Sequence, residues 1–105
     1  MGKQAPITYR EFYDVPRMFL VLHNGLRFLF ECRFDDNLDD YAETYKVFLM
    51  PPVETPDLGG SWEHLSESAT KFLGELPVKA VTFDETRRKA IDTQVIEELM
   101  KKKAA

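Results

Sequence analysis

The Asn24-Gly25 pair, set between two apolar runs, constrains the fold of this 105-residue chain more than any other feature. Asn-Gly is the preferred pair of a two-residue type I′ turn, because both residues tolerate positive φ and the turn matches the twist of the strands. It predicts a β-hairpin over residues 17–34 in which His23 faces Leu26. The same register places seven residues on one apolar face: Phe19, Val21, Leu26, Phe28, Phe30, Cys32 and Phe34.

The strand before this turn is apolar on both of its faces, since residues 18–22 form an uninterrupted apolar run. A strand of this kind usually lies inside a sheet, with a layer above and below it. We therefore expect a mainly antiparallel, strongly twisted sheet of four or five strands, built on the hairpin and either open or curled toward a small open barrel.

Two more strands are predicted after the hairpin, over residues 45–50 and 78–83. The first ends at a Pro-Pro pair, and the second begins after Pro77, where no donor to the strand ladder is needed. A short return strand over residues 88–91 would raise the number of strands from four to five. Residues 8–15 carry three aromatic side chains and are expected to form a lead-in that packs over the sheet.

Two helices are predicted in the second half of the chain. Ser61 is a suitable N-cap for a short middle helix, in which apolar residues recur at helical spacing as far as Leu73. A shorter helix followed by a strand over residues 70–76 is the alternative. Asp92 is the expected N-cap of an amphipathic C-terminal helix. The whole chain is thus predicted to be one α+β domain, with a short flexible N-terminus at residues 1–6.

The composition disfavours several classes of function. The formal net charge is −4, whereas nucleic acids and anionic membrane surfaces are bound through cationic patches. The longest apolar run, residues 18–22, is far shorter than the roughly 20 residues that cross a bilayer, and no apolar segment follows Lys3 as in a secretory signal. A lone cysteine, Cys32, cannot form an intrachain disulfide. We therefore expect a cytoplasmic protein that binds neither nucleic acid nor membrane.

No catalytic constellation is predicted. Cys32, His23 and His64 are the only thiol and imidazoles of the chain. The hairpin register separates His23 from Cys32 by about 20 Å along the strand, far beyond hydrogen-bond reach. The geometry does not exclude His64 as a partner of Cys32, although a buried, inert cysteine is the more common case.

The aromatic residues after the turn would suit a platform for stacked bases. The chain lacks the Gly and basic residues that surround such a platform, which favours packing of these aromatic residues in the core.

The acidic segment over residues 35–46 departs from a calcium-binding loop. With Asp35 in the first position, the sixth position, which requires Gly, is Asp40, and the twelfth, which requires Glu, is Lys46. Two histidines without spaced cysteines give no zinc pattern either. A solvated acidic turn that binds neither metal nor cofactor is therefore expected.

Two functions stay open. A non-catalytic protein-interaction domain, binding a protein partner or a second copy, is favoured because the chain has more large side chains than two small layers need. The contact region is expected around residues 57–65, where Trp62 follows a Gly-Gly pair, although Trp62 would also fit a lid on the core. The alternative is a small-molecule-binding domain or small enzyme with a cleft near the same residues. The candidate binding residues are Trp62, His64, Arg33, Tyr41 and Tyr45.

Calcium is expected to leave the stability of the protein unchanged. Millimolar calcium, compared with a chelator, should not shift the melting temperature measured by circular dichroism, because residues 35–46 lack the required glycine and terminal glutamate. A saturable rise of the melting temperature at micromolar calcium would contradict the assignment of this segment as a solvated turn.

Overall fold

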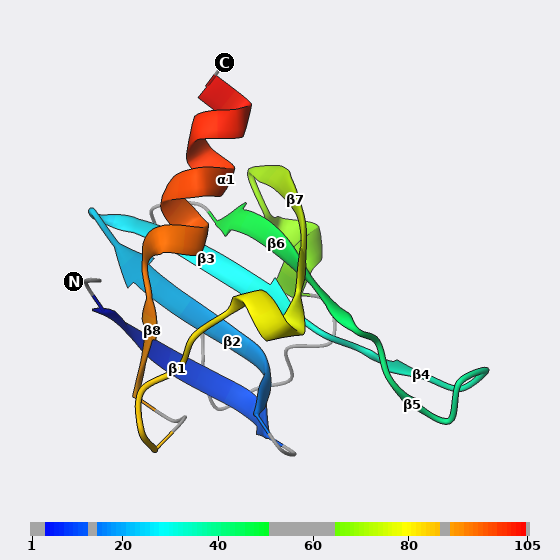
Figure 1. Cartoon of the computed structure of the whole chain (residues 1–105). Helices are drawn as coiled ribbons and strands as arrows, with labels where there is room; N and C mark the ends of the chain where they lie inside the picture. Colours follow the sequence, from blue (N-terminus) through cyan, green and yellow to red (C-terminus); the bar gives the residue numbers. More distant parts are fainter. Residues whose placement is uncertain (1–3, 13–14, 51–64, 87–88, 105) are drawn as a thin grey trace.

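Six antiparallel strands form a twisted main sheet in the order β7-β6-β3-β2-β1-β8 in this computed structural model (Figure 1). The structure describes residues 4–12, 15–50, 65–86 and 89–104. The strands of the main sheet are β1 (Gln4–Phe12), β2 (Pro16–His23), β3 (Leu26–Glu31), β6 (Thr44–Met50), β7 (Lys71–Pro77) and β8 (Ala90–Asp92). The remaining elements are the small β4 (Phe34–Asp35) and β5 (Asp40–Tyr41), the 3₁₀ turns η1 (Leu65–Ser68) and η2 (Val78–Ala80), and the helix α1 (Gln94–Ala104). The fold is therefore α+β with a mainly antiparallel sheet, as the sequence predicts.

Asn24 and Gly25 connect β2 to β3 with φ angles of 52° and 75°, the left-handed conformation that a type I′ turn needs at both positions. The strands then pair in antiparallel register, beginning with His23 opposite Leu26. This is the register that the two turn residues dictate. It decides which side chains of both strands face the helix.

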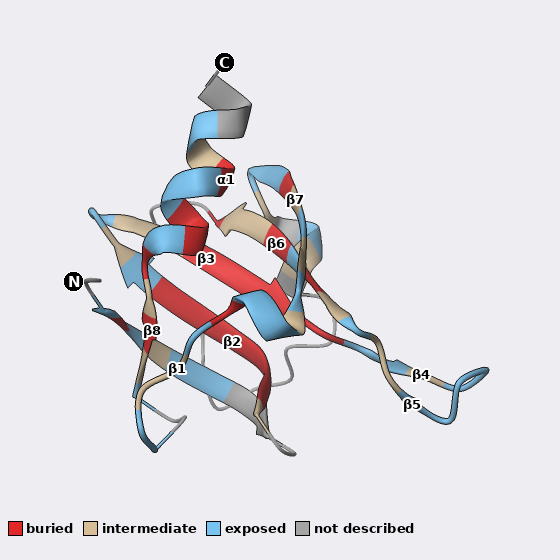
Figure 2. Ribbon diagram, in the orientation of Figure 1, coloured by how far each residue is buried: buried red, intermediate tan, exposed pale blue. Residues whose placement is uncertain are grey.

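One face of the sheet packs against α1 and forms the main core, with β2 and β3 at its centre (Figure 2). Phe19 and Phe30 stack with their ring centroids 4.8 Å apart, and Tyr45 meets Phe19 edge-on at 5.4 Å. The Tyr45 hydroxyl donates a hydrogen bond of 2.6 Å to the carbonyl oxygen of Pro16. From α1, the side chains of Val95, Ile96 and Leu99 join the same cluster.

The opposite face carries a second buried cluster, made of Met18, Leu20, Leu29 and Met50. Phe48 and Ala69 pack against it. β2 is thus buried on both of its faces from Pro16 to Val21, which agrees with its uninterrupted apolar run.

The segment before β2 differs from the expectation of an aromatic lead-in that packs over the sheet. Residues 4–12 form β1, which pairs with β2 on one side and with β8 on the other. The prediction was wrong because β2 needs a hydrogen-bonded neighbour on the side away from β3, and β1 supplies it. The sheet consequently has six strands instead of four or five.

Residues 78–83 do not form the predicted strand. The first three of them make the 3₁₀ turn η2, and Phe83 then forms a single bridge with Ile91. Pro77 ends β7 instead of opening a strand. The Val78 N–H still donates to the carbonyl oxygen of Glu43, next to the last β6–β7 pair, and the chain leaves the sheet in η2.

The predicted middle helix is also wrong where the structure describes it. Only η1 is helical, and residues that were expected to continue the helix as far as Leu73 belong to β7. Ser61, the expected N-cap, lies outside the described residues. β7 follows the alternative of a strand over residues 70–76. Its register against β6 shifts between Val47 and Phe48, and Gly74 adopts a φ of 138° there. This β-bulge interrupts the strand alternation in the sequence.

The C-terminal helix begins two residues after its expected N-cap. Asp92 ends β8, and its carboxylate accepts a 2.9 Å hydrogen bond from the Gln94 N–H. Thr93 directly precedes the helix, and its carbonyl oxygen accepts the N–H groups of Ile96 and Glu97. Asp92 therefore stabilises the first turn from one position further out than predicted.

Asp84 closes the turn that leads into β8. One carboxylate oxygen accepts the Thr86 hydroxyl and N–H, and the other accepts the N–H groups of Lys89 and Ala90. The Thr86 hydroxyl, and then these backbone donors, hold the pKa of Asp84 well below its ordinary value, while desolvation opposes them. The hydrogen-bond donors of the folded state therefore stabilise the charged form of Asp84.

Gly25→Val should lower the free energy of unfolding by about 1 kcal/mol or more, because a β-branched residue fits poorly at positive φ. No atom lies within 4 Å of the place of an added Cβ, so the effect is conformational and not a clash. Gly25→Asn is the control, since Asn tolerates this conformation and should lose less stability. Equal losses in urea denaturation would contradict the turn assignment.

Asp84→Asn should lower the melting temperature at pH 7. The asparagine side chain has one acceptor oxygen where the carboxylate has two, so two of the four hydrogen bonds to Asp84 lose their acceptor. A lowered pKa in the folded state contributes stability above the unfolded pKa of about 3.9, and this contribution is lost as the pH falls through the folded pKa. The difference from the wild type should therefore be constant between about pH 7 and 5 and shrink below about pH 4. The exposed Asp36→Asn is the control, and a difference independent of pH would contradict this role for Asp84.

Candidate functional site

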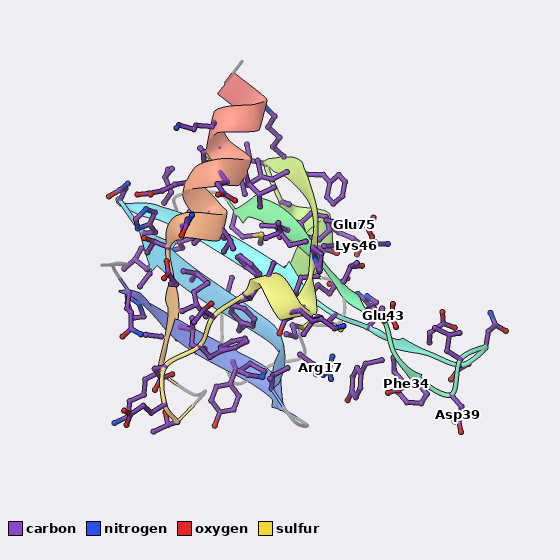
Figure 3. The ribbon with its side chains drawn as sticks, viewed as in Figure 1. Arg17, Phe34, Asp39, Glu43, Lys46 and Glu75 are labelled. Atoms are coloured by element: carbon purple, nitrogen blue, oxygen red, sulfur yellow. The ribbon has the colours of Figure 1, made fainter. Side chains whose placement is uncertain are left out.

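Residues 34–41 form an arm that projects away from the main sheet (Figures 1 and 3). The arm consists of β4, β5 and the turn between them, with Phe34 opposite Tyr41 and Asp35 opposite Asp40. At its base, the Ala42 N–H donates a 2.9 Å hydrogen bond to the carbonyl oxygen of Arg33. The arm is thus a hydrogen-bonded hairpin of its own, inserted between β3 and β6.

Carboxylates shape the turn of the arm. The Asp35 side chain accepts the Asn37 N–H at 2.8 Å, and the Asp35 carbonyl oxygen accepts the Leu38 N–H at 3.1 Å. Asp39 adopts a φ of 53°, a conformation that aspartate tolerates better than most residues. Asp40 accepts the Tyr41 N–H through its own carboxylate. Aspartates at these positions therefore have a local structural role in addition to their charge.

Two large apolar side chains of the arm face solvent. Leu38 is 63% exposed, the highest value among the described large apolar residues, and Phe34 is 50% exposed. The rings of Phe34 and Tyr41 meet edge-on, with their centroids 5.5 Å apart. Figure 3 shows Asp39 at the far end of the arm and Phe34 nearer the sheet. The arm therefore presents apolar surface away from the core.

Buried contacts fix the base of the arm. The guanidinium of Arg17, in β2, lies 4.6 Å from the centroid of the Tyr41 ring, and its Nη1 donates to Cys32 Sγ at 3.3 Å. The Cys32 thiol in turn donates to the carbonyl oxygen of Ala42 at 3.0 Å. Cys32 is 1% exposed. These contacts link the first strand of the hairpin to both ends of the arm.

Open hollows lie on two sides of this base. One, with a volume of about 370 Å³, extends from Phe34 and Asp35 to Lys46 and Glu75 on the sheet. The other, of about 450 Å³, lies between Arg17, Tyr41, Glu43 and Lys79. Both hollows are lined mainly by polar and charged residues.

The first hollow contains a row of neighbouring charges of opposite sign. Glu31 is 4% exposed, and Arg33 donates to both of its carboxylate oxygens, at 2.6 and 3.2 Å. Lys46 lies opposite Glu31 on one side and opposite Glu75 on the other. The buried carboxylate of Glu31 is satisfied by Arg33, so loss of Arg33 would leave an uncompensated charge at the base of the arm.

The five predicted binding residues are distributed unequally. Arg33 and Tyr41 lie together at the base of the arm, where each lines one hollow. Tyr45 is fully buried in the core, where its hydroxyl is bonded to Pro16, so it has no surface to offer a partner. Trp62 and His64 lie outside the described residues, as does the expected contact region except for its last residue.

Leu38 and Phe34 were missed as surface residues. Phe34 was assigned to the apolar face of the hairpin, but β3 ends at Glu31 and the chain leaves the main sheet. The sequence does carry a signal: two Asp-Asp pairs flank Asn37-Leu38, and an aromatic residue stands at each end. Such symmetry about a turn is typical of a short hairpin.

No protein-family model matches the chain, and no curated protein or solved structure matches it. Within the described parts of the chain, no group of three or more His, Cys, Asp or Glu residues is arranged to hold a metal ion. The one described α-helix spans 11 residues, and no described helix has the length and apolar character to cross a membrane. The geometry of the arm is therefore the main guide to function.

Proposed function

We propose that this chain is a non-catalytic protein-interaction domain and that the arm is its contact element. The observation that carries this proposal is the exposure of Leu38 and Phe34 on a hairpin that projects from the sheet and is anchored at its base. Exposed apolar side chains are unfavourable in water, and the free energy falls when the surface of a partner covers them.

The anchoring of the arm supports a role in recognition. An element that is already ordered loses little conformational freedom on binding, so more of the contact energy remains as affinity. The turn hydrogen bonds of Asp35 and Asp40, together with Arg17 packed on Tyr41, provide that order. An apolar side chain at the end of such an element is suited to fill a recess on a partner, as interface hot spots do.

The environment of Cys32 supports a non-catalytic role. Its thiol is buried and engaged with the guanidinium of Arg17 and the carbonyl oxygen of Ala42, which is a structural arrangement. A single cysteine held in this way also fits the reducing conditions of the cytoplasm, the compartment that we propose for this chain.

A small-molecule site is the second candidate, because hollows flank the arm. Small-molecule sites are typically concave and mostly apolar, with few polar groups. The hollows here are open and lined mainly by polar and charged residues, and in one of them Arg33 already pairs with Glu31. The exposed apolar side chains of the arm lie beside them, so a macromolecular partner is favoured.

Leu38→Ser should weaken capture of a partner by about tenfold or more, as is typical of a central apolar contact. The immobilised variant is compared with the wild type in an extract of the organism that makes the protein, and bound proteins are quantified by mass spectrometry. Leu22→Ser is the matched control, because Leu22 is 51% exposed at the other end of β2.

At least one protein should be retained by the wild type and by Leu22→Ser and lost with Leu38→Ser. All three should share one melting temperature within error, since both positions are exposed. Equal retention of every protein by the three baits would overturn the assignment of the arm as the contact element.

A further inference from the structure

We infer, on the basis of the proposed function, that the partner of the arm presents a basic protein segment, in which lysine or arginine side chains surround an apolar recess for Leu38. The distribution of charge in the chain leads to this inference. The chain has 14 Lys and Arg residues and 18 Asp and Glu residues. The arm holds four of the aspartates and no cationic residue, which leaves 14 charges of each sign elsewhere. The whole net charge of −4 is thus concentrated in eight residues.

The aspartates at the turn of the arm form no ion pair with other described residues. Asp36 and Asp39 are exposed, and Asp39 lies at the far end of the arm (Figure 3). Among the described residues, the ion pair of Arg33 with Glu31 and the contact of His23 with Glu97 involve none of the four aspartates. Because the arm extends away from the sheet, its carboxylates create a negative field where a partner would approach.

Acidic residues lie on both sides of Leu38 in the arm, so a partner that covers Leu38 also covers carboxylates. Leu38 stands directly before Asp39 and is separated from Asp36 by one residue. Removing carboxylates from water against a neutral surface is unfavourable. Lysine or arginine side chains around the recess would compensate for the lost hydration and would fix the orientation of the partner.

The hollow beside Phe34 has the same sign of charge and extends this surface toward the sheet. Its charged lining consists of Glu31, Asp35, Asp36 and Glu75 against Arg33 and Lys46, an excess of two negative charges. An extended basic segment can therefore run from the turn of the arm to its base. The hollow on the other side has no such excess, since Asp40 and Glu43 are matched there by Arg17 and Lys79.

Selection of random phage-displayed peptides on the immobilised full chain at low salt tests this inference. The selected peptides should be rich in Lys and Arg and contain an apolar residue. The affinity of the best peptide is then measured by fluorescence polarisation. Asp36→Asn/Asp39→Asn should weaken it about fivefold or more at low salt, and the difference should shrink as salt is added.

Glu85→Gln/Glu98→Gln is the matched control, because it removes two exposed carboxylates outside the arm. It should leave the affinity of the peptide unchanged within about twofold. Leu38→Ser should abolish binding in either salt condition.

The outcomes separate the two proposals. The inference of a basic partner would be overturned by peptides that lack basic residues, or by peptides that bind the aspartate variant and the glutamate control equally. The arm would still stand as the contact element if Leu38→Ser abolished the binding of these peptides. Peptides that are insensitive to Leu38→Ser as well would overturn both proposals.

Sedimentation of the wild type tests a second copy of the chain as the partner. Salt-sensitive self-association that is lost in Lys101→Glu would overturn a separate partner protein and would assign the contact to the lysine-rich helix end of a second copy.

Discussion

The stacking of Phe19 on Phe30 is the contact on which the rest of the structure depends. The two residues are directly opposed across β2 and β3, and Tyr45 and Phe83 complete the cluster around Phe19 at 5.4 and 5.6 Å. A slip of one residue in the register would move Phe30 to the other face of the sheet and remove the surface on which α1 packs. The Asn24-Gly25 turn prevents that slip, so a local conformational preference determines a contact between distant layers.

The aromatic core also determines the position of the arm. Tyr45 bonds through its hydroxyl to Pro16, and the next residue, Arg17, packs on Tyr41 and donates to Cys32. Core and arm are therefore joined through two consecutive residues of β2. A change in the core that displaced Tyr45 would be transmitted to the arm through the backbone of Pro16 and Arg17.

The sequence was most informative where structure depends on neighbouring residues. The β2–β3 register follows from two turn residues, and the double burial of β2 follows from its apolar run. β1 is harder to recognise, because its register against β2 shifts twice and its pairing with β8 joins residues far apart in the chain. In β7, the bulge at Gly74 disrupts the strand period, and Ala69 and Leu73 are spaced as in a helix.

The candidate site was predictable only in part, for related reasons. Residue type points to Arg33 and Tyr41, and both lie at the base of the arm. Residue type points equally to Tyr45, but Tyr45 is buried beside Val47 on the core face of β6, and residue type does not show on which face a side chain lies. Leu38 was hidden among aspartates, whose composition indicates a solvated turn but not that the turn projects from the molecule.

The bulge in β7 has a consequence for the behaviour of the protein at high concentration. β7 is an outer strand of the sheet, and an uninterrupted outer strand is a template on which further chains can add. Gly74, with its φ of 138° and the shifted register beside it, breaks the straight row of backbone donors and acceptors. The β7 edge is thereby a poor template for edge-to-edge addition of further chains, although the arm exposes apolar side chains elsewhere on the molecule.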